Sequence, residues 1–277
     1  MKCVFTVTDR DHAYVHMAKI LVATARLNSN VDLCCLYAGQ KQGFISWLAS
    51  WDVPCIKWQV PYLDKIHEKY TGKKSVDYCG GAYLCIEISQ ALKKNGFDDA
   101  YALYLDVDTM VLNDFQLDHK QPTYFAAPPD WNISDWTFVS AGVMVLNLKR
   151  MRQDYDQFVE HLFRHNFDFA FAGHGPCSQG AWNTFYTNKW DKLAPEYDWK
   201  PWWGFNLEAK VVHFSGPKPK EIPSLLIQAS IKTEETEREK INRFVVQQDV
   251  ESYRKYLRIW NKYDKLISEG VPHEEEK

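Results

Sequence analysis

The sequence lacks two features that would place it in a common class at once. Its 277 residues contain no run of about eighteen apolar residues, which a membrane-spanning helix needs. There is no excess of positive charge, because 33 lysine and arginine residues face 36 aspartate and glutamate residues. A chain this close to neutral is not a general duplex binder. We therefore expect neither a transmembrane protein nor a nucleic-acid partner.

The seven cysteines give no sign of a disulfide framework. Their number is odd, no two are spaced as Cys-x-x-Cys, and the neighbours Cys34 and Cys35 would face opposite sides of a strand. The charged residues Asp9, Arg10 and Asp11 also interrupt the N-terminal segment where a signal peptide needs its apolar region. We therefore expect reduced thiols and a cytoplasmic protein.

The composition is that of a globular protein with more aromatic side chains than usual. Hydrophobic residues make up 45% of the chain, charged residues 25% and aromatic residues 15%, so a disordered chain is excluded. At this length the chain can form one large α/β domain or two smaller ones, and composition alone does not choose between them.

Apolar runs alternate with amphipathic segments along most of the chain. Short aliphatic and β-branched runs predict strands over 3–8, 31–38, 53–58, 101–105, 124–127 and 138–146. Helical spacing of apolar side chains predicts helices over 15–27, 42–51 and 83–94, and after Asn147 and Ser178. The βαβαβ order at the start implies an α/β fold whose mostly parallel sheet is covered on both faces.

The composition changes at Thr233, where four glutamates open a charged helix. We therefore divide the chain into a main domain over 1–232 and a helical extension over 233–277. Aromatic and aliphatic side chains form a helical stripe in this extension: Tyr253, Tyr256, Trp260, Tyr263 and Ile267. The stripe can dock onto the protein's own body. Basic residues flank it, so a homodimer seam or a peripheral contact with anionic lipid stays open as an alternative.

An apolar strand that ends in two carboxylates is the most informative feature of the sequence. Asp106 and Asp108 follow the run 101–105, and an extended chain places residues i and i+2 on one side, about 7 Å apart. Paired carboxylates call for a cation, and ligands of open α/β sheets bind at the carboxyl ends of strands. The alternative is a polar strand end whose aspartates only cap a turn.

A second polar cluster follows the β-branched residues 211–212. His213 is a ligand type that suits Mn²⁺ as well as Zn²⁺, Gly216 allows close approach to the backbone, and Lys218 offers a positive charge for phosphate. A single histidine at a strand end can instead have only a structural role, with one nitrogen bonded to the backbone. Together with the two aspartates, the cluster suits a divalent cation that bridges a diphosphate.

With these motifs in view, the sequence resembles the family 8 retaining glycosyltransferases, the group of glycogenin and the bacterial lipopolysaccharide galactosyltransferases. The resemblance spans residues 3 to 220 and rests on the order of five motifs: the first strand with its loop, the Tyr-Leu-Asp-x-Asp strand end, the Ala-Gly-Val-x-x-x-Asn strand, the Gln-Gly-x-x-Asn helix start and the His-Phe-x-Gly…Lys-Pro ending. It implies a GT-A fold, a Rossmann-like, mixed and mostly parallel sheet flanked by helices.

The family also implies an enzyme with a defined reaction. It would transfer a hexose from a UDP-sugar, with glucose or galactose as the expected sugar, to an acceptor hydroxyl with retention at the anomeric carbon. Mn²⁺ or Mg²⁺ would be the cofactor. The acceptor would be a glycan, a glycolipid or a protein, and the sequence does not choose among them.

The resemblance assigns roles to individual residues. Asp106, Asp108 and His213 would be the metal ligands. The nucleotide donor would be held by a larger set: Thr8, Asp9, Tyr14, Asp106, Val107, Asp108, Gly216 and Lys218. Asp130 would contact the donor sugar, Gln179 would lie near its anomeric carbon, and these two residues together with Lys218 are the expected catalytic residues.

Two positions depart from the family pattern. Ser140 stands where the family commonly has Asn, and Ser178 stands where it commonly has Asp. Because both are sugar-contacting positions in the family, we expect a changed donor preference.

Three interpretations stay open. Paired aspartates also occur in two-metal phosphohydrolases and nucleotidyltransferases, and the two serines are compatible with a nucleotide-sugar binder that does not turn over. The aromatic tract 199–205 either stacks on an acceptor sugar or forms a packed turn.

Overall fold

A computed structural model describes residues 1–9, 12–70, 81–169, 177–227 and 236–269. In this part of the chain, seven strands form one sheet in the order β3-β2-β1-β4-β7-β6-β8. Their bounds are β1 (Lys2–Val7), β2 (Asp32–Tyr37), β3 (Cys55–Lys57), β4 (Tyr101–Leu105), β6 (Phe125–Ala127), β7 (Val143–Asn147) and β8 (Trp190–Lys192). Strands β1 to β4 are mutually parallel, β7 is antiparallel to β4 and β6, and β8 is parallel to β6. The predicted mixed, mostly parallel sheet is confirmed.

Successive residues of the central strands enter two cores on opposite faces of the sheet. In β1, Phe5 belongs to one core and Val4 to the other. In β2, Cys35 and Cys34 divide in the same way, as predicted for neighbours on a strand. Because both faces are covered, these strands are continuous apolar runs without alternation.

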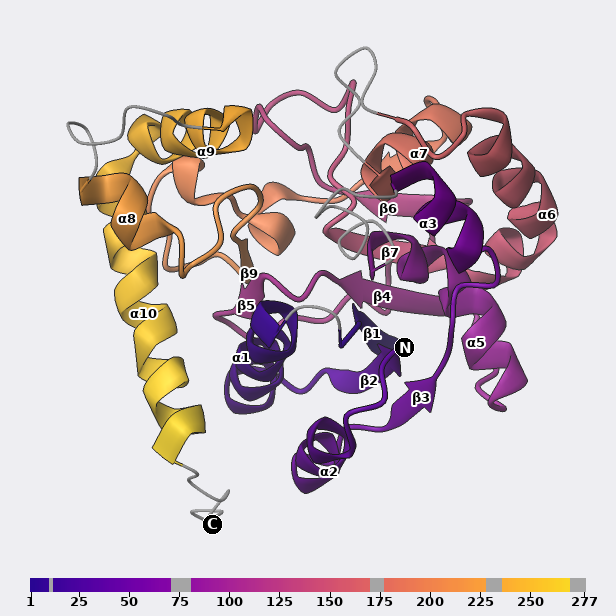
Figure 1. The fold of residues 1–277 in the computed structure, drawn as a ribbon, viewed down its shortest axis with the longest axis horizontal. Coiled ribbons are helices and arrows are strands. Elements are labelled where there is room, and N and C mark those ends of the chain that lie inside the picture. The colour runs from indigo at the N-terminus through magenta and orange to yellow at the C-terminus, as the bar shows by residue number, and fades with distance from the viewer. Residues whose placement is uncertain (10–11, 71–80, 170–176, 228–235, 270–277) are drawn as a thin grey trace.

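Helices cover both faces of the sheet (Figure 1). The core that contains Phe5 includes side chains of α1 (His12–Asn28) and α2 (Gln42–Ser50). The opposite core includes side chains of α3 (Leu63–Tyr70), η1 (Leu84–Glu87), α5 (Ile88–Lys94), α6 (Leu148–Arg164) and α7 (Cys177–Phe185). The predicted helices are therefore present, the one over 83–94 beginning with the 3-10 turn η1. Helix α3 and strand β8 are elements that the sequence pattern did not reveal.

A second, two-stranded sheet continues from the end of β4. Strand β5 (Thr109–Val111) follows β4 after three residues and pairs antiparallel with β9 (Val211–His213), so that Thr109 lies opposite His213. The short helices η3 (Pro195–Asp198) and η4 (Pro201–Trp203) precede β9, and α8 (Ile222–Ile227) follows it. This pairing brings a histidine close to the aspartates although more than a hundred residues separate them in the chain.

The predicted strand over 138–146 forms only as β7, from Val143 to Asn147. The residues before it leave the sheet because side chains of α7 take their backbone hydrogen bonds. Val139 N donates to Asn183 Oδ1 at 2.9 Å, and Ala141 N donates to Gln179 Oε1 at 3.1 Å. The segment before β7 is thus tied to α7, and towards β6 it keeps only an isolated bridge between Val139 and Pro129, with Ser140 N donating to Pro128 O at 3.0 Å.

The single charged helix predicted after Thr233 is wrong, because the described residues form two helices, α9 (Glu237–Gln248) and α10 (Val250–Glu269). Thr236 and Glu239 cap the start of α9 with reciprocal hydrogen bonds. Asp249 lies between the helices with an extended φ of −155°, and its Oδ1 accepts a hydrogen bond from Ser252 N at 2.9 Å. A new cap at Asp249 therefore ends one helix and starts the next.

The aromatic stripe of α10 packs on the protein's own body, as one of the two predicted alternatives has it. Tyr253, Tyr256 and Trp260 are buried in the core that contains Phe5, and Figure 1 shows α10 running beside α1. The Trp260 ring meets Phe214, the residue after His213, edge to face at 5.3 Å. A dimer or membrane contact through this stripe finds no support. The division of the chain at residue 232 stays a prediction.

Two further observations concern the described residues. Six cysteines, Cys3, Cys34, Cys35, Cys55, Cys85 and Cys177, are free thiols. Across the described ranges, no helix has both the length and the apolar character needed to cross a membrane.

Removal of the Trp260 side chain tests whether α10 is part of the fold. Because Trp260 is 3% exposed and supports Phe214, Trp260→Ala is expected to lower the free energy of unfolding by about 3–5 kcal/mol. Urea denaturation measures this loss. The exposed neighbour Lys262 provides a matched control, since Lys262→Ala should change stability by less than about 0.5 kcal/mol. Equal, small effects of both substitutions would show that α10 is only loosely attached.

Candidate active site

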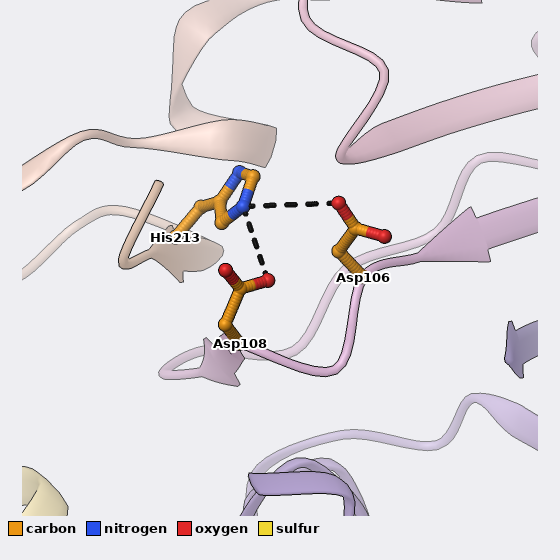
Figure 2. Close-up of side chains that lie close together, drawn as sticks. All are labelled: Asp106, Asp108 and His213. Carbon is orange, nitrogen blue, oxygen red and sulfur yellow. Dashed lines mark ion pairs between the residues drawn. The ribbon is translucent and has the colours of Figure 1, made fainter. Parts of the chain in front are cut away.

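Asp106, Asp108 and His213 meet at the carboxyl end of β4. Each offers one ligand atom, and these atoms all lie within 4.8 Å of one another. His213 Nε2 is 3.2 Å from Asp108 Oδ1 and 4.0 Å from Asp106 Oδ2, and Figure 2 shows the ring nitrogen facing both carboxylates. The structure thus brings together three residues that the sequence proposed as a group.

Backbone hydrogen bonds fix the turn that carries the two aspartates. Asp106 N donates to Gly142 O at 2.7 Å, and Asp106 O accepts from the Thr109 hydroxyl at 2.6 Å. Asp108 O accepts from Phe214 N at 3.0 Å, which ties the turn to the end of β9. Val107, between the aspartates, is buried and packs in the core. The carboxylates are therefore held by three segments that come from distant parts of the sequence.

Gly142 makes room for the imidazole ring of His213. A Cβ atom on Gly142 would overlap the Cε1 and Nδ1 atoms of that ring. Since Gly142 also accepts the hydrogen bond from Asp106 N, the same glycine positions both sides of the cluster. A residue with any side chain would force the ring away from the carboxylates.

The charges of the cluster perturb one another. Burial and the negative charge of Asp108 raise the pKa of Asp106 to about 6. Burial also opposes ionisation of Asp108, but the charges of Lys218 and His213 outweigh it and lower the pKa of that carboxyl. Lys218 Nζ forms an ion pair with Asp108 Oδ2 and donates to Phe214 O at 3.2 Å. Two carboxylates this close would be stabilised by an additional positive charge.

A buried ion pair, not predicted from the sequence, lies on the opposite edge of the His213 ring. Asp198 Oδ1 is 2.8 Å from His213 Nδ1, and Asp198 Oδ2 accepts from Lys200 Nζ at 2.7 Å. Burial and the Lys200 charge lower the pKa of His213, but Asp108 and Asp198 outweigh them and raise it to about 9. Despite burial, Lys200 and His213 lower the pKa of Asp198 to about 2.

Ser140 is buried and takes part in hydrogen bonds beside His213. Its side chain is completely buried, its hydroxyl accepts from Lys200 Nζ at 3.0 Å, and it also lies 3.3 Å from Gly142 N. The expected effect of this serine on donor preference stays a prediction. The residue is part of the buried network behind His213.

Asp130 and Gln179 form a hydrogen-bonded pair. Gln179 Nε2 donates to Asp130 Oδ2 at 3.1 Å, while its Oε1 accepts from Ala141 N at the same distance. Burial raises the pKa of Asp130, against the lowering effect of the Lys200 charge. The two residues proposed to lie at the donor sugar are thus neighbours, and both are connected to the segment 139–142.

The residues proposed to hold the nucleoside follow β1. The Asp9 carboxylate accepts hydrogen bonds from Tyr37 OH and Gln40 N, and from Lys41 N at 3.0 Å, so it holds the loop after β2. Thr8 lies against Gly81. Tyr14, on α1, is partly buried against the core. These side chains lie at the carboxyl ends of β1 and β2, the edge of the sheet where β4 also ends.

Gly216 and the aromatic tract take different positions around β9. Gly216 has a φ of +80°, which favours glycine, and is exposed on the turn after β9. Within the tract 199–205, Trp199 Nε1 donates to Gly204 O at 2.8 Å. Trp202 and Trp203 both donate to the carbonyl of Trp131, the residue after Asp130. The tract therefore forms a packed turn at the side of the site, and no ligand contact is needed to explain it.

Sequence comparisons do not identify a family. No family model and no curated protein matches this chain. Comparison of structures gives a different result, because more than two hundred solved chains are similar to this one.

Three of these solved structures illustrate the similarity. The glycosyltransferase GlyE of Streptococcus pneumoniae TIGR4 has a TM-score of 0.57 at 15% identity, over 100% of this chain and 66% of that one. Galactosyltransferase LgtC, in complex with donor and acceptor sugar analogs, has a TM-score of 0.58 at 16% identity, over 92% of this chain and 99% of that one. Mouse xyloside xylosyltransferase 1 has a TM-score of 0.51 at 14% identity, over 77% of this chain and 97% of that one.

This chain spans less than two thirds of the length of GlyE but matches LgtC along almost all of it. At such low identity the similarity establishes the fold and not the reaction. The structure neighbours are glycosyltransferases of the family 8 type, and this chain has their GT-A fold.

Proposed function

We propose that this protein is a metal-dependent hexosyltransferase that takes its sugar from a UDP-sugar, with glucose or galactose as the expected donor sugar. The observation that carries this proposal is the convergence of Asp106, Asp108 and His213 with Lys218 at the carboxyl end of β4. In an α/β sheet this edge is where ligands bind. Because the chain has a GT-A fold, hexosyl transfer is better supported than other reactions that use paired aspartates.

The residues present fit a divalent cation such as Mn²⁺ or Mg²⁺. Two carboxylate oxygens and one imidazole nitrogen form a donor set that Mn²⁺ accepts well. Burial and the charge of Asp108 raise the pKa of Asp106, so a cation between the two carboxylates would favour their ionised forms. Asp106, Asp108 and His213 would hold the ion. When bound, such an ion acts as a Lewis acid that stabilises negative charge on a departing diphosphate.

Lys218 is the residue that would stabilise the diphosphate from the protein side. Its ammonium group forms an ion pair with Asp108, so it lies beside the residues that would hold the cation and could neutralise charge on a bound diphosphate. The turn at Gly216 brings it back to β9, since Lys218 Nζ also bonds Phe214 O. A fixed positive charge here favours the leaving group more than the bound donor.

Asp130 and Gln179 are proposed to contact the donor sugar. Their mutual hydrogen bond fixes both polar groups in one orientation. For retention, the acceptor hydroxyl would attack the anomeric carbon on the face that the diphosphate leaves, and a donor phosphate oxygen would take the proton. A covalent route would use the Asp130 carboxylate as nucleophile. The acceptor is proposed to be a glycan, a glycolipid or a protein.

A two-metal phosphohydrolase or nucleotidyltransferase is less well supported. Such enzymes need a second ion held by further carboxylates, about 3.5–4 Å from the first. Within the ranges that the structure describes, His, Cys, Asp and Glu side chains form one cluster suited to a metal, the one at β4. The rival that deserves a direct test is a nucleotide-sugar binder without turnover.

The Asp108→Asn variant tests the metal-dependent reaction. Because the substitution removes one negative ligand, Mn²⁺-dependent release of UDP from UDP-glucose or UDP-galactose is expected to fall by at least a factor of about 100. Thermal-shift assays with each UDP-sugar, with and without Mn²⁺, identify the donor beforehand.

The control is Asp156→Asn, an exposed aspartate on α6 that belongs to another Asp-x-Asp triplet, and it should behave like the wild type. Unchanged turnover in Asp108→Asn would reject the metal role. Mn²⁺-dependent binding of the UDP-sugar with no turnover in the wild type would establish the non-catalytic binder.

The Gly142→Ala variant tests the placement of His213. An added Cβ overlaps the ring, so we expect Mn²⁺ affinity to fall by about tenfold or more, the usual effect of misplacing a ligand through its surroundings. Mn²⁺ binding is followed by the loss of the free-ion electron paramagnetic resonance signal. Gly43→Ala is the matched control, because a Cβ at Gly43 meets nothing within 4 Å. Wild-type affinity in Gly142→Ala would contradict the proposed position of His213.

A further inference from the structure

Lys200 and Asp198 form an ion pair that has no contact with solvent. Both side chains have a relative exposure of 0%, which is rare for charged residues and is tolerated only when they are paired. Trp199 between them pairs with β9: Trp199 N donates to Val211 O at 2.8 Å, and His213 N donates to Trp199 O at 2.9 Å. Residues i and i+2 of this extended segment therefore face the same side, toward the ring of His213.

Two groups compete for His213 Nδ1. Asp198 Oδ1 lies 2.8 Å from it and Lys200 Nζ lies 2.9 Å from it. An acceptor such as Asp198 requires a proton on Nδ1, whereas donation by Lys200 requires that Nδ1 be free of one. Whether Nδ1 carries the proton also determines the state of Nε2. A neutral imidazole with its proton on Nδ1 presents a lone pair at Nε2, toward Asp106 and Asp108.

The hydrogen-bond balance decides in favour of a proton on Nδ1. With the proton there, the Asp198 carboxylate forms two charge-assisted bonds, one with the ring and one with Lys200. Without it, the Oδ1 lone pair of a fully buried carboxylate faces the lone pair of Nδ1, and burial of an unsatisfied charged acceptor is costly. Lys200 loses little, since it keeps bonds to Asp198 Oδ2 and to the Ser140 hydroxyl.

Lys200 has two effects on this arrangement. It binds Oδ2 of Asp198 and so leaves Oδ1 turned toward the ring. The positive charge of Lys200 also balances the negative charge of Asp198, so the pair adds no net charge behind His213. The Nδ1 edge of the ring thus faces a neutralised pair, while the Nε2 edge faces Asp106 and Asp108.

We infer that Asp198 and Lys200 are positioning residues that keep the His213 proton on Nδ1 and leave Nε2 available to a divalent cation. The inference rests on the proposed function, in which His213 is a metal ligand. It assigns a role to two residues whose side chains have no exposed surface, and it explains why a fully buried lysine lies beside the proposed metal cluster.

In the Asp198→Asn variant, the proton of His213 is expected to change its ring nitrogen. Lys200 still requires an acceptor and would take the amide oxygen, which turns the amide NH₂ toward His213 Nδ1. The proton then moves to Nε2 and points at the cation site, as happens when an amide replaces the aspartate of a serine-protease triad. In the Asp198→Asn background, Lys200→Met removes the ammonium group that binds the amide oxygen. That oxygen can then accept a hydrogen bond from Nδ1–H again. A second substitution is thus expected to repair the first.

Two measurements test the inference on the full chain. ¹⁵N spectra of histidine-labelled protein with saturating Mg²⁺, a diamagnetic ion, report which ring nitrogen of His213 carries the proton. Titration with Mn²⁺ alone reports affinity. We expect an Nδ1 proton in the wild type and an unprotonated Nδ1 with at least about tenfold weaker Mn²⁺ binding in Asp198→Asn. The double variant should recover the Nδ1 proton and come within about threefold of wild-type affinity.

The wild-type spectrum is decisive without any variant, because a proton on Nε2 and not on Nδ1 would overturn the inference. So would an Asp198→Asn protein with wild-type affinity, or a double variant that binds Mn²⁺ no better than the single one. A melting curve of each variant separates these outcomes from loss of fold. An Nδ1 proton in a wild type that binds no Mn²⁺ would instead refute the proposed metal-dependent function and leave the ring assignment in place.

Discussion

The position of one imidazole ring governs the whole site. His213 reaches the aspartates after β4 because β9 pairs with β5, and it fits there because Gly142 has no side chain. Its Nε2 edge faces Asp106 and Asp108, and its Nδ1 edge faces Asp198. A shift of the ring by the width of one methyl group would break contacts on both edges, so the surrounding backbone leaves it little freedom.

The two edges of the ring differ in their balance of charge. Behind it, Asp198 and Lys200 neutralise each other out of contact with solvent. In front, Asp106 and Asp108 face Lys218 and the ring of His213, and burial together with the charge of Asp108 raises the pKa of Asp106 to about 6. Asp106, the more exposed of the two carboxylates, lies on the side that opens to the carboxyl end of β4. That is the electrostatic environment expected of a site that takes up a cation together with an anionic diphosphate.

Local patterns in the sequence predicted the sheet, most of the helices and the two aspartates. The buried strands read as apolar runs, and Asp106 and Asp108 stood out because they follow such a run directly. His213 and Lys218 stood out as ligand types after a second short strand, and the resemblance to a family then assigned His213 to the same metal as the two aspartates. Asp198 and Lys200 were missed because a buried ion pair has no periodicity, and in a tract rich in tryptophan a charged residue looks like a solvated turn.

Other errors have equally physical causes. Asp249 reads as one more charge on a helical face, but its side chain caps a new helix. The residues before β7 have strand-like composition, but Gln179 and Asn183 of α7 take their hydrogen bonds. The contacts with α7 join residues about forty positions apart, so no local window contains them, whereas the cap at Asp249 is a local contact that the spacing of apolar side chains does not reveal.

The most direct measurement of the central claim is anomalous diffraction from a crystal grown with Mn²⁺ and UDP. We expect one strong manganese peak within bonding distance of Asp106, Asp108 and His213 Nε2, with the diphosphate on the side of Lys218. A peak bound by other residues, or a nucleotide bound at this edge of the sheet without a metal peak, would contradict it.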